Sequence, residues 1–463
     1  MLQKIKNILN YESGNFNLNT LMIGFFFFLS GLLGLLRNNL LASRFGAGDQ
    51  LDIYFASFKI PDLIFNLLIF GAISVGFIPS FLKEWHKDKE KAWDLVNNFF
   101  HFIVFFSLIL IILLIILMPI IVPVIAPGFS NEKIKAIISL SRLLLIQPLF
   151  LGMAAVFSGV LQSFKKFLAY SLAPLFYNLG IIGGIIFLVP PYGLNGLIYG
   201  VIIGAFFNFL IQLVTVYQSG FKYQFIFNLK NQVLRQIIKL TLPRSFDLLI
   251  SQANLVLITV FSSYLASGSL TIISFARDLT NFVVTLFAVS FAVSSFPVFT
   301  TLVNQGNYEE LKKFINQVIV KILFFSIPIA GIFLIFRAPI VKLIFSYGQF
   351  TAEHTLLTIQ TLGFLALSII PLGLTQTLIR IFFSLSDTKT PFFVSLITFI
   401  MNIILMSVFS KTLGVPGLAL TMTITSFFQV IVLIIILQKK INWFEKKLFL
   451  GSIKEIFKKI LKN

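Results

Sequence analysis

Three charged side chains lie close together in a very apolar chain, and they are the residues best placed to bind a ligand. Arg37, Asp52 and Lys59 fall within the stretch RNNLLASRFGAGDQLDIYFASFKIPDL, between two strongly apolar runs. A charge at the centre of a membrane costs at least about 2.5–3.5 kcal/mol on insertion scales. Arginine and lysine at such positions need a partner or a ligand, so this stretch indicates what the protein binds.

Arg37 comes near the end of the first apolar run. Gly31, Gly34, Asn38 and Asn39 surround it in sequence. Small and amide residues suit a helix that faces a packed, wet interior. The alternative is an arginine that extends to the outer membrane interface and carries no ligand.

Lys59 lies deeper in the second run, just before Pro61. Proline has no N–H, so it releases a carbonyl near the start of this span. A cation beside a broken helix predicts an anion site. Asp52 can neutralise either cation, and a purely structural ion pair is the alternative.

The second half of the chain offers one further cation, in the stretch ISFARDLTNF. Arg277 and Asp278 are adjacent, so their side chains point about 100° apart on a helix and need not pair. Arg277 is therefore a second candidate for contact with an anionic ligand.

The elements that position these residues are membrane helices. The chain has 463 residues, of which 57% are hydrophobic and 11% charged, whereas soluble domains carry roughly 25% charged residues. The chain has no cysteine and only three histidines, scattered in sequence, so we expect no disulfide, no metal centre and no cofactor. The net charge of +19 fits membrane topology better than nucleic-acid binding.

Apolar runs of roughly 20 residues, long enough to span a membrane, recur about twelve times. Basic residues occupy every second connection, while connections such as 190–196 and 267–271 are nearly uncharged. Positive residues stay on the cytoplasmic side, so both termini are expected there. The expected spans are 20–41, 53–82, 97–123, 139–163, 170–190, 194–217, 236–265, 271–302, 315–346, 354–385, 390–410 and 415–438.

An internal repeat relates the two halves. Residues 162–178 parallel residues 386–402 at a spacing of 224 (402 minus 178), which matches Asn178 with Asn402. We therefore count both asparagines among the candidate substrate-binding residues. The predicted fold is an all-α integral membrane protein with two six-helix lobes, 1–220 and 221–440, and substrate between them. Coincidence among apolar helices is the alternative.

The tail, 441–463, has a different pattern. Its apolar residues form one helical face and its lysines form the other. This pattern predicts an amphipathic helix on the anionic inner leaflet, and a role only in fixing topology is the alternative.

No enzyme is indicated. The chain has no Walker A motif, and no nucleophile–histidine–acid set is readable. Cations in both halves favour a carrier of an anionic molecule. A drug antiporter that exports cations would be expected to carry carboxylates instead. A membrane scaffold that recruits partners through its basic tail is a third possibility.

The chain resembles the MurJ/MviN lipid II flippases of the MOP exporter superfamily, over nearly its whole length. The match begins with the pattern R-x6-RFGAG-x3-D-x5-FKIP-x-L from Arg37 to Leu63. It continues in APGF (126–129), SYLASGSL (263–270), YGQFT (347–351) and SLSDTKTP (384–391).

The resemblance implies a V-shaped bundle with a central cationic cavity in a bacterial inner membrane. Its implied activity is to move lipid-linked peptidoglycan precursor from the inner to the outer leaflet by alternating access. The ligand is of the undecaprenyl-pyrophosphate type, whose phosphates Arg37, Lys59 and Arg277 would bind. The alternative is a related exporter for another polyprenyl-linked glycan, or a multidrug antiporter. A monomer is expected.

The chain departs from the family pattern at several positions. Gly31 stands where the family has an arginine, and Phe65 or Asn66 stands where it has another. Arg277–Asp278 reverses a family Asp-Arg pair. Some members resemble sodium-coupled carriers, with a carboxylate one turn after an asparagine. Here Asn402 matches the asparagine, but Met406 stands at the position of the carboxylate.

Overall fold

The computed structural model describes residues 16–66, 76–445 and 448–452. Within that part of the chain every regular element is helical, which confirms the all-α prediction. Contacts divide the chain into two compact units, Met1–Tyr264 and Leu265–Asn463. Each unit is described by itself, and the predicted lobe boundary at 220/221 stays a prediction.

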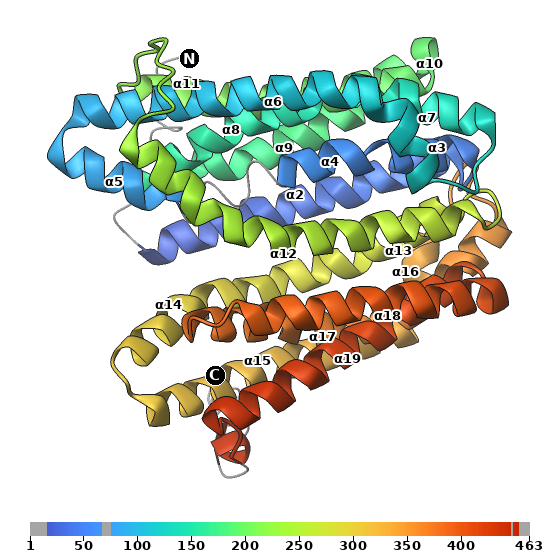
Figure 1. Cartoon of the computed structure of the whole chain (residues 1–463). Coiled ribbons are helices and arrows are strands. Elements are labelled where there is room, and N and C mark those ends of the chain that lie inside the picture. The colour runs from blue at the N-terminus through green and yellow to red at the C-terminus, as the bar shows by residue number, and fades with distance from the viewer. Residues whose placement is uncertain (1–15, 67–75, 446–447, 453–463) are drawn as a thin grey trace. The chain divides into compact units, whose positions relative to one another are not determined.

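In the first unit, α11 packs against α8 and α9, while α2 packs against α9 (Figure 1). The elements, including the π-helical segment η3, are α2 (Phe16–Phe45), α3 (Asp49–Ser57), α4 (Lys59–Phe65), α5 (Ile78–Lys87), α6 (Lys89–Ile125), α7 (Asn131–Leu144), α8 (Ile146–Ser163), α9 (Phe167–Gly183), η3 (Gly184–Leu188), α10 (Val189–Tyr192), α11 (Leu194–Gln218) and α12 (Gln232–Ser263).

In the second unit, α17 is central and packs against α13, α15 and α19. The elements, including the π-helical segment η4, are α13 (Ser269–Val284), η4 (Thr285–Val289), α14 (Ser290–Asn304), α15 (Tyr308–Ile335), α16 (Arg337–Phe345), α17 (Ala352–Ser384), α18 (Lys389–Leu413) and α19 (Val415–Ile441).

Ten stretches of helix among the described residues are long and apolar enough to cross a membrane. The predicted span 53–82 contains most of α3, all of α4 and the start of α5, with residues 67–75 outside the described ranges. The predicted span 236–265 falls almost entirely within α12, in which Leu249–Ser263 is a shorter apolar stretch among the residues searched. The membrane class is thus supported, and a count of twelve stays a prediction.

Polar side chains begin several of these helices. Ser130, Asn231 and Asn307 each accept a hydrogen bond from the backbone N–H three residues further on. Thr351 and His354 form a reciprocal capping box at the start of α17. Such caps satisfy N–H groups that a helix leaves open at its first turn. His354, one of the three histidines, therefore has a structural role.

Glycine allows α9 and η3 to approach α11 closely. A Cβ at Gly200 would lie 2.6 Å from the Cα of Gly184 and 2.9 Å from the carbonyl oxygen of Gly180. Only glycine fits such a backbone contact, and small residues commonly line helix pairs in membranes. The first unit therefore depends on this packing.

Local backbone features recur between the two units. Lys165 and Ser386 have φ of 57° and 58° in the turns before α9 and α18. Gly193 and Gly414 have φ of 57° and 63° with ψ of −136° at the starts of α11 and α19. Both pairs are 221 positions apart (386 minus 165, and 414 minus 193), three fewer than the sequence match at 224. This recurrence supports the predicted repeat, which remains a proposal.

The start of the predicted interfacial tail is packed into the second unit. Trp443 is buried in the core of that unit, and its carbonyl accepts a hydrogen bond from Asn316 Nδ2 at 2.8 Å. The residues that define the predicted amphipathic face, 453–462, lie outside the described residues. Interfacial binding by the tail therefore stays a prediction.

Candidate functional site

Arg37 is held against α9 by an asparagine far away in sequence. Its Nη1 donates to Asn178 Oδ1 at 3.2 Å, and its Nε and Nη2 donate to Asn38 Oδ1 at 3.2 and 3.0 Å. Arg37 is half-buried, whereas both asparagines are buried. A guanidinium has five N–H donors. The two amide oxygens orient Arg37 without neutralising its charge.

Asn178 is itself fixed in direction. Its Nδ2 lies within hydrogen-bonding distance of Ser30 Oγ at 3.2 Å and of the carbonyls of Ser30 and Pro174 at 3.3 Å each. Its Oδ1 is thereby turned toward Arg37. The sequence predicted Asn178 as a substrate-binding residue, and the structure places it as the residue that positions Arg37.

A second group of polar side chains adjoins this pair. Gln147 Nε2 donates to the hydroxyl of Tyr177 at 3.1 Å, and the charges of Arg37 and Asp62 both act on Tyr177. Gln147 also lies near the Asp62 carboxylate, and its Oε1 is buried without a hydrogen-bond partner in the structure. Sequence reasoning missed Asp62, Gln147 and Tyr177.

A signal for this second group was present in the sequence. Asp62 follows Pro61 directly, and Gln147 directly precedes Pro148, so both are polar residues beside a proline in an apolar run. Such residues are costly in a membrane and indicate a packed polar interior.

Lys59 and Asp52 lie on the two sides of a helix break. Asp52 is fully buried in α3, and Lys59 is the half-buried first residue of α4. The charge of Lys59 reaches Asp62, one turn further on. Pro61 lies in the first turn of α4, so the prediction of a helix broken at this proline is confirmed.

The second unit contains the remaining two candidates, Arg277 and Asn402. Arg277 is half-buried on α13, beside Asp278. Asn402 on α18 accepts a hydrogen bond at Oδ1 from Thr425 Oγ1 on α19 at 2.8 Å. Met406, one turn after Asn402, is buried. The described residues hold no group of three or more histidine, aspartate or glutamate side chains that could bind a metal ion.

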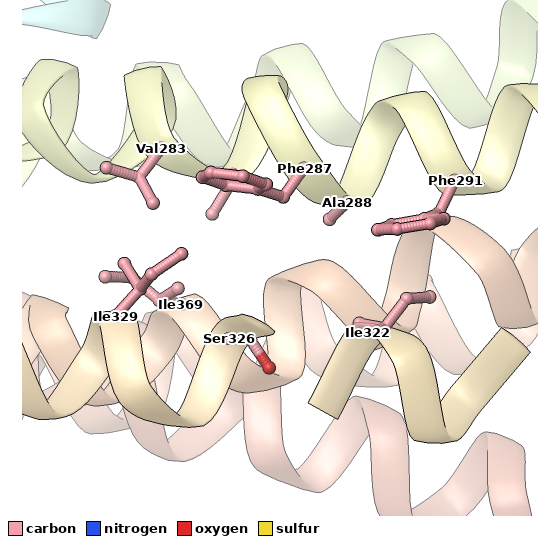
Figure 2. A pocket seen from close by; sticks show the side chains of 9 residues that line it. Val283, Phe287, Ala288, Phe291, Ile322, Ser326, Ile329 and Ile369 are labelled. Atoms are coloured by element: carbon pink, nitrogen blue, oxygen red, sulfur yellow. The ribbon is translucent and has the colours of Figure 1, made fainter. Parts of the chain in front are cut away.

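An apolar pocket lies in the second unit, and none of the polar candidates above lines it. Figure 2 shows Val283, Phe287, Ala288 and Phe291 facing Ile322, Ser326, Ile329 and Ile369. Among the residues that line it, only Ser326 is polar, and its hydroxyl is buried without a partner in the structure. A pocket of this composition does not suit a charged ligand.

Curated proteins and solved structures resemble this chain over most of its length. A protein of Buchnera aphidicola subsp. Acyrthosiphon pisum named probable lipid II flippase MurJ is 29% identical over 411 residues, which cover 88% of this chain and 80% of that protein. A protein of the same name from Borreliella burgdorferi is 27% identical over 426 residues, covering 91% and 83%.

Two solved structures share the fold. The lipid II flippase MurJ in an inward closed conformation matches with a TM-score of 0.75 and 24% identity, covering 96% of this chain and 93% of that one. An inward-facing multidrug resistance MATE family transporter of the MOP superfamily matches with a TM-score of 0.77 and 15% identity, covering 89% and 94%. At these identities both likenesses show the fold alone.

The family model described as lipid II flippase MurJ matches residues 41–461. The match covers most of the chain, and it confirms the family resemblance that the motifs indicated. The chain belongs to the lipid II flippase MurJ family.

Proposed function

We propose that this protein moves lipid II, a lipid-linked peptidoglycan precursor, across a bacterial inner membrane. Its family and its curated relatives, which are named lipid II flippases, support this activity. The activity is transport by a multi-pass membrane protein rather than catalysis of a reaction. We infer from the distribution of basic residues that both termini lie in the cytoplasm.

The single observation that supports substrate binding most directly is the contact between Arg37 and Asn178. Neutral amides orient the guanidinium. Charge-assisted hydrogen bonds from arginine and lysine suit the oxygens of a pyrophosphate. We assign binding of the lipid pyrophosphate to Arg37 and Lys59 in the first unit. Arg277 is the candidate for phosphate binding in the second unit.

Transport then follows from alternating access. The head group would bind to the cations while the polyprenyl tail stays in lipid, and rocking of two repeats would expose the site to each side in turn.

The test is complementation in a bacterium depleted of its own lipid II flippase. We expect the unmodified chain to restore growth and Arg37→Ala or Lys59→Ala to abolish it at equal membrane expression. Lys135→Ala is the control, because Lys135 is exposed on α7 in the same unit. Normal growth of both site variants would overturn the anion-site assignment.

A second candidate is a related exporter for another polyprenyl-linked glycan. It would use the same cations, so complementation by the unmodified chain separates the two. A multidrug antiporter of cations is disfavoured by Arg37, Lys59 and Arg277, although the MATE likeness in fold keeps it as an outcome of the same experiment.

A further inference from the structure

The connection between α11 and α12 has no helix and is attached to the side of α6. Residues 221–228 form no regular element, and Figure 1 shows this part of the chain crossing α6 near the end at which α6 begins. A connection of this kind would ordinarily be a water-exposed tether.

Two neighbouring asparagines of α6 bind the backbone of this connection. Asn97 donates from Nδ2 to the carbonyl of Lys222 at 3.0 Å and accepts from the N–H of Gln224 at 3.1 Å. Asn98 donates to the carbonyl of Asn228 at 3.1 Å and accepts from the N–H of the same residue at 2.8 Å. Each amide thus pairs with the backbone as a neighbouring strand would.

Aromatic side chains of the connection lie along α6. Tyr223 Oη is 2.9 Å from His101 Nε2, and the ring of Phe225 stands edge-on to His101 with centroids 4.7 Å apart. The ring centroids of Phe227 and Phe105 are 4.9 Å apart. The backbone of the connection stays at the level of Asn97 and Asn98, and its aromatic side chains extend from there toward the apolar middle of α6.

These aromatics remain open on their other side. Tyr223 is 61% exposed and Phe225 is 78% exposed, and both lie between the exposed Lys222 and Lys230. The same face of α6 continues as a row of exposed apolar side chains at helical spacing. The row is Phe105, Ile109, Ile112, Ile116 and Ile120.

We propose that this connection is a strap that lies in the headgroup region of the inner leaflet and binds anionic phospholipids. Its aromatics lie where the lipid-facing row of α6 begins, and tyrosine and other amphipathic rings favour that depth. Lys222 and Lys230 provide charges complementary to anionic headgroups. A water-borne protein partner would leave this continuity with the lipid-facing row unexplained.

The amides of Asn97 and Asn98 hold the strap at its depth. Both side chains are 1% exposed, and each has its donor and its acceptor satisfied by the connection. We call these two asparagines the clamp. The exposed aromatic surface of the strap therefore depends on the clamp and does not involve the cations assigned to lipid II.

The chain contains no cysteine, so a single spin label can report the position of the strap. Full-length Phe225→Cys is labelled and placed in phosphatidylcholine vesicles with or without phosphatidylglycerol. Accessibility to oxygen and to a water-soluble nickel complex gives the depth. Lys91→Cys serves as the aqueous control, and Ile116→Cys serves as the acyl-chain control.

We expect the label at 225 to lie between the two controls, and deeper when phosphatidylglycerol is present. Lys222→Gln with Lys230→Gln should remove that dependence on phosphatidylglycerol. Nickel accessibility equal to that of the label at 91 in both vesicles would overturn the lipid assignment and leave the face to a soluble partner.

The clamp is tested separately with the same label. Asn97→Leu should make the label at 225 more mobile and more accessible to nickel. If that variant fails to fold, Asn98→Asp removes one donor and should give a smaller change in the same direction. Unchanged mobility in a folded variant would overturn the role of the asparagines.

Discussion

Ser141 donates a hydrogen bond from Oγ to the backbone carbonyl of Ser57 at 3.1 Å. In a continuous helix that carbonyl would accept from the N–H at position 61, but Pro61 has no N–H. Both serines are buried. The Ser141 hydroxyl on α7 thus donates to the Ser57 carbonyl that Pro61 leaves without a donor. This carbonyl, close to Lys59 in sequence, therefore already has a hydrogen-bond partner.

We predict that Ser141→Ala lowers stability by about 1–3 kcal/mol, because it leaves a buried carbonyl without a donor. The measurement is the apparent melting temperature of the purified protein in detergent. Ser139→Ala is the control, since that serine is exposed on the same helix.

The same site offers a double-mutant test of this cause. Pro61→Ala supplies an N–H that can bond the carbonyl of Ser57 directly. The loss of stability caused by Ser141→Ala should therefore be smaller when Pro61→Ala is also present. Equal losses in both backgrounds would show that the serine stabilises the fold in some other way.

The contact between Asn178 and Arg37 leads to a prediction about binding. Asn178→Asp places a carboxylate against the guanidinium, so it should weaken binding of a polyprenyl pyrophosphate more than Asn178→Ala does. Arg37→Ala should weaken it about tenfold or more, because a charged hydrogen bond is worth about 1.5–3 kcal/mol. Native mass spectrometry measures the affinities, and the exposed control Lys135→Ala should match the unmodified chain.

Much of the fold could be predicted because composition and periodicity are local properties. The scarcity of charge indicates a membrane protein, and the length of the apolar runs places most helices. The position of Pro61 even predicts the break before α4. The sequence could not identify Ser141 as the donor to the carbonyl of Ser57, because 84 residues separate the two serines.

The candidate site was predicted less completely, for the same reason. Arg37 and Lys59 stand out as charges in apolar runs, which sequence reveals. The role of Asn178 depends on a contact across 141 residues. The repeat predicted Asn178 from its match with Asn402, whereas the structure shows its contacts with Ser30 and Arg37 on α2.

Close packing between α9 and α11 gives a prediction with a control next to it. Gly200→Ala should lower the apparent melting temperature, because overpacking of this kind costs about 1–3 kcal/mol. Gly183→Ala should have no such effect, because nothing lies within 4 Å of its Cβ position. Equal effects of the two variants would show that glycine is not required for this helix contact.

The turn between α17 and α18 is held by Asp387. This carboxylate accepts from Thr390 N–H at 3.0 Å, from Thr390 Oγ1 at 2.6 Å and from Lys440 Nζ at 2.6 Å. Partial burial acts to raise the pKa of Asp387, but the hydrogen bonds from Lys440 and Thr390 outweigh it and lower the pKa from 3.8 to about 2.

The stabilisation by Asp387 should therefore depend on pH in a defined window. A lowered pKa means that the folded protein binds this proton less readily than the unfolded chain does. The contribution is complete above the ordinary value of 3.8 and is lost as the pH falls through about 2. Asp387→Asn should make the melting temperature less dependent on pH in that window. Glu309→Gln, which removes an exposed pair with Lys312, should leave the dependence unchanged. An unchanged slope in Asp387→Asn would show that other carboxylates determine the acid stability of this protein.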